Sequence, residues 1–161
     1  MAHPEYSAFA IANAFVQKAG QGAIPNLTPM KLQKLLYFTQ AWHLKVRGFP
    51  LLDDHFARWK HGPVIPAVYH EFRAYGHRPI TRKATTLAMS DDDYAVKIPM
   101  VPLADRDTWG LIDAIIDRYG AVDAQELSRM THLEGSAWAT GGGADGTVIT
   151  AEQIRNDPSI Q

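Results

Sequence analysis

The stretch that decides the fold is LTPMKLQKLLYFTQAWHLKVRGFPLLDDHFARWKHGPVIPAVY, residues 27–69. Thr28 is placed to cap a helix whose first position is Pro29, where the missing backbone donor costs nothing. The helix is predicted to reach residue 46 or 47 and to stop at Gly48. Apolar residues cover most of its circumference. Such a helix is either central in its domain or covered by a partner, and the central position is the simpler expectation.

Spacing within this helix defines the face expected to pack inward. The stripe consists of Leu32, Leu35, Leu36, Thr39, Trp42 or His43, and Val46. A histidine in such a stripe is more often a packed polar tip than a ligand or a base. The stripe therefore predicts a core helix whose polar members are structural.

Downstream of this helix the pattern changes. HFARWKHGPV, residues 55–64, alternates loosely and predicts a short strand entering a turn at Gly62 and Pro63. Pro66 suits the first turn of a further helix that stops at Gly76. Residues 77–102 lack periodicity and are expected to be irregular, with a short hairpin whose strand candidates are residues 80–89 and 94–102.

The rest of the chain carries helix signals. Helices are expected over residues 8–18, 105–120 and 124–130, and after Thr150. Ser7 can cap the first, while Asp123 with Glu126 and Thr150 with Gln153 have the spacing of capping boxes. The sequence thus predicts a mainly α, compact single-domain fold over residues 1–161, with a short strand or hairpin element in the middle.

Composition limits the classes of function. The chain has 161 residues, 46% of them hydrophobic, and no cysteine. Disulfides and thiolate metal sites are therefore excluded, and a reducing cytosol suits the chain. The N-terminus has no basic leader, and no apolar run approaches the roughly 18 residues of a membrane span. We expect a soluble cytoplasmic protein with no membrane contact, no metal and no cofactor.

Charge is unevenly distributed along the chain. Residues 58–83 hold six bases against Glu71 alone, a balance of +5, and residues 105–157 hold ten acids against four arginines, a balance of −6. A basic segment can meet nucleic acid or an acidic partner. The two segments could equally face each other or lie in water. A dedicated nucleic-acid domain is more often basic overall, so nucleic acid is the less favoured partner.

Catalytic motifs are not apparent. The seven histidines never form a helical His-Glu-x-x-His pattern, and no Gly-x-Ser-x-Gly elbow occurs. His61, His70 and His132 stay open as candidates for a hydrolase, because distant residues can converge in space. The sequence nevertheless favours a protein that is not an enzyme.

Three segments in combination resemble one family. They are MKLQKLLYFTQAWHL at 30–44, FPLLDDHFARWKHGPVIPAVYHEF at 49–72 and THLEGSAW at 131–138. Together they resemble the Panacea-domain family, which includes the SocA-type antitoxins. The resemblance is weakest over residues 77–102, and it departs at Ala137, where the family pattern favours proline before the tryptophan.

The resemblance implies a bacterial or phage-associated antitoxin that binds a cognate protein toxin. Some members resemble adaptors that deliver the toxin to an AAA+ protease of the ClpXP kind. For such an adaptor, residues 151–161 would be either a flexible protease tether or a final helix. A nucleic-acid-binding autoregulator using residues 58–83 is the alternative function.

Candidate partner-binding residues follow from exposed chemistry within the family motifs. They are Trp42, Trp59, Lys60, His61, Tyr69 and Arg73. Trp59 and Tyr69 are expected to act as anchors, because aromatic residues carry much interface energy, and Lys60 and Arg73 would steer by charge. The alternative for such motif residues is that they maintain the fold while variable loops contact the toxin.

Overall fold

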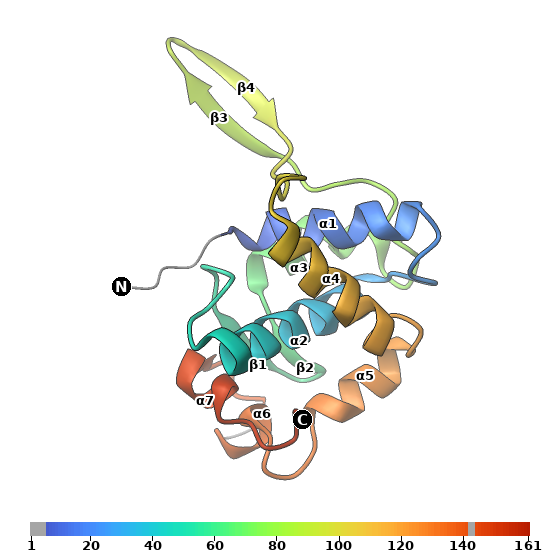
Figure 1. Ribbon diagram of the computed structural model, residues 1–161, viewed down its shortest axis with the longest axis vertical. Coiled ribbons are helices and arrows are strands. Elements are labelled where there is room, and N and C mark those ends of the chain that lie inside the picture. The colour runs from blue at the N-terminus through green and yellow to red at the C-terminus, as the bar shows by residue number, and fades with distance from the viewer. Residues whose placement is uncertain (1–5, 142–143) are drawn as a thin grey trace.

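Helix α2 (Pro29–Arg47) forms the centre of the molecule. The computed structural model describes residues 6–141 and 144–161 (Figure 1). The helices that pack against α2 are α1 (Ala8–Gly20), α3 (Pro66–Phe72), α4 (Arg106–Tyr119), α5 (Ala124–Thr131) and α7 (Ala151–Arg155). From Leu32 to Leu44, the side chains of α2 are buried all around the helix, except that Trp42 is only partly buried. The predicted central helix is therefore confirmed.

The last turn of α2 departs from the predicted stripe. Val46 is 72% exposed, because residues 46–48 lie outside the packed part of the helix. Including Val46 in the core was therefore wrong. His43 is buried, and its Nδ1 lies 2.7 Å from the carbonyl oxygen of Phe49, which confirms it as a packed polar tip.

Local capping signals decide where the helices begin. Ser7, Thr28, Asp123 and Thr150 each accept a hydrogen bond from a backbone N–H in the first turn of their helix. The capping box at Thr150 is complete. The box predicted at Asp123 is not, because Glu126 instead forms an ion pair with Arg129, with 2.6 Å between oxygen and nitrogen.

A small antiparallel sheet lies beside α2. Its strands are β1 (Phe56–Trp59), β2 (Gly62–Val64) and β5 (Val148–Ile149), in the order β2-β1-β5. β1 is the short strand expected within residues 55–64, but the turn lies at Lys60 and His61. Gly62 and Pro63, where the turn was expected, belong instead to the second strand β2. Strand β5 and the short helix α6 (Ala137–Thr140) were not predicted from the sequence.

The segment between α3 and α4 contains the hairpin that the sequence suggested. After α3 the chain continues through the 3₁₀ turn η1 (Arg73–Tyr75) to Gly76. Strands β3 (Thr86–Ser90) and β4 (Asp93–Lys97) then pair antiparallel, and Figure 1 shows them projecting from the body as an arm. Both strands are shorter than predicted, and the rest of residues 77–102 is irregular.

The C-terminal segment is packed against the body. Ile154, Asp157 and Ile160 are buried, and Tyr37 donates its hydroxyl hydrogen to Asp157 at 3.2 Å. Of the two expectations for residues 151–161, the final helix is confirmed and the flexible tether is wrong. No helix among the described residues is both long and apolar enough to span a membrane.

Candidate partner-binding groove

Five of the six predicted partner-binding residues lie along one groove, which we call the turn groove. Trp59, Lys60 and His61 enter it from the β1–β2 turn, while Tyr69 and Arg73 enter it from α3 and η1. The groove encloses about 380 Å³ and its lining is mostly apolar. The rings of Trp59 and Tyr69 meet edge to face, with 4.9 Å between centroids. An aromatic pair flanked by cations suits recognition of another protein.

Three side chains of the C-terminal third hold the turn between β1 and β2 through contacts with its backbone carbonyls. Trp138 Nε1 donates to the carbonyl oxygen of Trp59 at 2.9 Å. His132 Nε2 lies 3.0 Å from the carbonyl oxygen of Lys60, and Ser128 donates to that of His61 at 2.7 Å. Three successive carbonyls are thus occupied, so the side chains of the turn are presented from a preorganised backbone.

Gly62 is required where the turn enters β2. Its φ of +113° favours glycine, and an added Cβ would lie 2.6 Å from Thr131 Oγ1 and 3.1 Å from Lys34 Nζ. The glycine therefore allows β2 to pass close to both α2 and α5.

Lys34 forms the buried floor beneath this glycine. Its side chain is fully buried, and Nζ donates to the carbonyl oxygen of Pro63 at 3.0 Å. Burial removes water from the ammonium group and lowers the pKa of Lys34 to about 7. The groove therefore lies above an amine whose charge changes near neutral pH.

Arg58 connects the sheet to the C-terminal segments. Only 2% of it is exposed, and its guanidinium donates five hydrogen bonds. The acceptors are the carbonyl oxygens of Ala137, Trp138 and Val148, Thr147 Oγ1 and Gln153 Oε1. Arg58 counted toward the basic segment in the sequence, but it is buried and is not available to phosphates.

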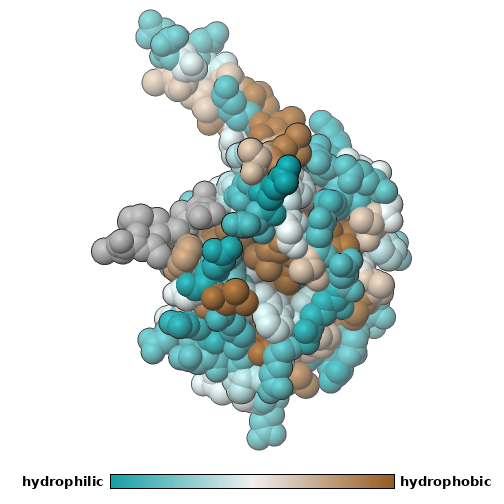
Figure 2. Space-filling view, in the orientation of Figure 1, coloured by the Kyte–Doolittle hydropathy of each residue, from teal (hydrophilic) through white to brown (hydrophobic). Residues whose placement is uncertain are grey.

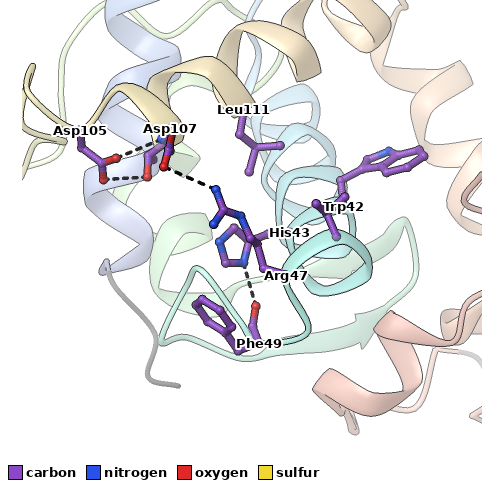
Figure 3. Close-up of a pocket in the computed structure, with 9 residues that line it drawn as sticks. Trp42, His43, Arg47, Phe49, Asp105, Asp107 and Leu111 are labelled. Atoms are coloured by element: carbon purple, nitrogen blue, oxygen red, sulfur yellow. Dashed lines mark hydrogen bonds and ion pairs between the residues drawn. The ribbon is translucent and has the colours of Figure 1, made fainter. Parts of the chain in front are cut away.

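Trp42, the sixth candidate, lies elsewhere. It borders a second cavity of about 300 Å³ between α2 and α4, shown in Figure 3. Trp42 Nε1 donates to Tyr119 Oη at 2.8 Å, and the guanidinium of Arg118 lies 5.0 Å from its ring. These contacts place Trp42 mainly in the packing between the two helices.

The polar groups of this second cavity serve the fold. Asp105 accepts from the backbone and hydroxyl of Thr108 at the start of α4, and Arg47 lies 3.5 Å from Asp107 (Figure 3). The hydrogen bonds from Tyr6 and Thr108 lower the pKa of Asp105 although partial burial opposes them. Fewer polar groups are therefore available to a partner in this cavity than in the turn groove.

The hydrolase hypothesis gains no support from the geometry. Both ring nitrogens of His132 lie within 3.0 Å of backbone carbonyl oxygens, those of Ser128 and Lys60. His61 and His70 are exposed. Within residues 6–141 and 144–161, no three His, Asp or Glu side chains are grouped to hold a metal ion.

Several residues that build the groove were missed from the sequence. In a sequence, a buried lysine or arginine cannot be distinguished from a surface charge, so nothing near Lys34 or Arg58 indicated that they are buried. The β3–β4 hairpin was predicted, but its exposed apolar face was not, although Leu87, Met89, Tyr94 and Val96 alternate with period two. That alternation could have identified an amphipathic hairpin.

Comparisons with known proteins point to one family. The family model described as "Antitoxin SocA-like, Panacea domain" matches residues 32–139. The curated protein "Antitoxin SocA" of Caulobacter vibrioides (strain NA1000 / CB15N) is 34% identical over 129 residues, which cover 80% of this chain and 66% of that protein, just under two thirds of its length. No solved structure is significantly similar.

Proposed function

The chain belongs to the SocA-like, Panacea-domain antitoxin family, and from this we propose that it binds and neutralises a cognate protein toxin in the cytoplasm. The observation that carries the proposal is the turn groove. It combines a partly exposed aromatic pair, two cations and a backbone held by three side-chain contacts. Binding, rather than catalysis, is the activity that such a surface supports.

Trp59 and Tyr69 are the proposed anchors for the toxin. Tyr69 is 40% exposed and Trp59 is half-buried, so a partner can cover the remaining surface of both rings. Central aromatic anchors commonly carry about 2 kcal/mol or more of binding free energy. Lys60 and Arg73 at the rim would affect mainly the association rate and its salt dependence.

The test is co-expression and pull-down with the product of the neighbouring gene. We expect that product to be toxic alone, to bind this chain and to become harmless with it. Trp59→Ala should weaken the complex by about 2 kcal/mol, roughly thirtyfold in Kd. Val46→Ala, at an exposed apolar position outside the groove, is the matched control and should leave affinity unchanged. Equal affinity of both variants would remove the groove from the interface.

Delivery of the toxin to an AAA+ protease of the ClpXP kind is the finer form of the proposal. It predicts that the half-life of the toxin falls when this chain is present and recovers when the protease is absent. Neutralisation with an unchanged toxin half-life would show blocking by occupancy instead.

A nucleic-acid-binding autoregulator is the second candidate. It would have to rely on exposed bases such as Lys60, Arg73 and Arg82, since Arg58 is buried. Binding through several phosphates would fall steeply between 50 and 200 mM salt, by roughly 10³ for six contacts. A complex with the toxin whose affinity falls much less steeply with salt separates the two functions.

A further inference from the structure

The β3–β4 arm carries an uncovered apolar face. The register pairs Leu87 with Val96 and Met89 with Tyr94, so all four side chains share one face of the hairpin. Each is 66–69% exposed. Ile98 continues the alternation beyond β4 and is 54% exposed. Figure 2 shows hydrophobic residues along the arm and hydrophilic residues at its tip.

The body of the molecule does not complete this hairpin. Within the described residues, β3 and β4 form a two-stranded sheet of their own. The pleat of the strands places the alternating apolar side chains on one face, a pattern typical of a sheet whose apolar face is covered. An isolated two-stranded hairpin is only marginally stable in water. Contiguous exposed apolar surface of this kind marks an interaction site.

The arm is nevertheless held in place at its base. Asn13 of α1 is fully buried and donates to the carbonyl oxygens of Ala84 at 3.0 Å and Pro99 at 2.8 Å. Its Oδ1 accepts from the backbone N–H of Ala84 at 2.7 Å. One side chain thus joins the two ends of the arm to the core, so the apolar face is presented in a defined direction.

The distribution of charge along the arm favours a second copy of the chain as the occupant of this face. The tip, residues 91–93, consists of three exposed aspartates, while Arg82, Lys83 and Lys97 lie near the base. Two arms packed in the same direction would bring six carboxylates together. Two arms packed in opposite directions would place each acidic tip beside the basic base of the other, which is self-complementary about a two-fold axis.

We propose that the arm is a dimerisation surface, in which the apolar faces of the β3–β4 hairpins of two copies pack against each other with their tips pointing in opposite directions. Five exposed apolar side chains provide on the order of 500 Å² per copy. The pair would bury about 1,000 Å² in total, the lower end for a specific interface. The dimer should therefore form in the micromolar range. The proposal does not depend on toxin binding.

Sedimentation velocity of the full chain, from about 1 to about 200 μM, tests the association. The wild type should shift with concentration from the mass of one 17.9 kDa chain to that of two. Met89→Ser with Tyr94→Ser should raise the dimer Kd at least about tenfold and leave the circular dichroism spectrum unchanged. Val46→Ser, another exposed apolar position, should leave the dimer intact.

The chain has no cysteine, so introduced cysteines can test the relative direction of the two arms without competing thiols. Under mild oxidation, a mixture of Asp92→Cys and Arg82→Cys chains should give the mixed disulfide in preference to Asp92→Cys joined to itself. A preference for the tip-to-tip product would overturn the arrangement. A wild type that stays monomeric to about 200 μM would overturn the proposal itself. If the variant with Met89→Ser and Tyr94→Ser then also failed to bind the toxin, the toxin would be the occupant of the face, and the proposal would again be overturned.

Discussion

Replacing Lys34 with methionine should change how the stability of the protein depends on pH. Lys34 is fully buried beneath the turn groove, and burial lowers its pKa from 10.5 to about 7. Methionine has a similar length, carries no charge and packs readily in irregular apolar space. The variant loses one hydrogen bond to the carbonyl oxygen of Pro63, a cost that is nearly constant above the pKa of Lys34, where the amine is neutral.

The sign follows from the protons bound in each state. Between about pH 7 and pH 10.5 the unfolded chain keeps the lysine proton while the folded chain releases it, so raising the pH stabilises the fold. Below about pH 7 both states are protonated, and the burial penalty is present in full. The shift corresponds to a total on the order of 5 kcal/mol, at about 1.4 kcal/mol per pH unit.

Urea unfolding of the wild type and of Lys34→Met at several pH values isolates this effect, since both proteins share every other titrating group. The unfolding free energy of the wild type should rise relative to the variant by about 3 kcal/mol between about pH 7.5 and about pH 10. It should level off below about pH 6.5. A difference that stays constant across this range would refute the assignment of a buried, neutral Lys34.

Three further substitutions test the packing around the groove and the arm. Arg58→Met removes five hydrogen bonds from the junction of β1 with the C-terminal segments and should lower the unfolding free energy by about 3 kcal/mol; a loss below about 1 kcal/mol in urea unfolding would contradict its central role. Gly62→Ala should cost about 2 kcal/mol, because the left-handed φ and the contact with Thr131 are both unfavourable, and a thermal melt at unchanged Tm would show that the turn adapts. Asn13→Ala should speed amide hydrogen exchange in the arm about tenfold or more while the helices keep their protection. An equal change of the exchange rates in the arm and in the helices would show that Asn13 does not anchor the arm.

Local signals predicted the helices well. Ser7, Thr28 and Thr150 act within four residues of their own helix, so a sequence reveals them without tertiary knowledge. The box at Asp123 failed because Glu126 had a competing partner in Arg129 one turn away. Helix starts were therefore predictable, whereas the choice among neighbouring polar partners was not.

Long-range pairing was not predictable from local pattern. Strand β5 is two residues long and exists because Phe56 and Ala57 offer it a partner more than ninety positions earlier in the chain. The contacts of His132 and Trp138 with the β1–β2 turn likewise join residues that are far apart in the chain. The sequence therefore indicated the groove residues of the turn, α3 and η1, but not the distant side chains that hold the turn in place.

Buried charge was the main source of error in the candidate site. Arg58 is almost fully buried and Lys34 is fully buried. Arginine and lysine are rarely buried in this way unless their charged groups have hydrogen-bond partners. Most of their acceptors are backbone carbonyls, and all of them lie on distant segments that no sequence spacing identifies. Counting charges along residues 58–83 therefore overstated the basic surface.

The most direct test of the central claim is the affinity of this chain for the product of the neighbouring gene, measured by titration calorimetry alongside a growth-rescue assay. We expect a stoichiometric complex that rescues growth, weakened roughly thirtyfold by Trp59→Ala and unchanged by Val46→Ala. A neighbour that is harmless alone and does not bind the wild-type chain would contradict the antitoxin function.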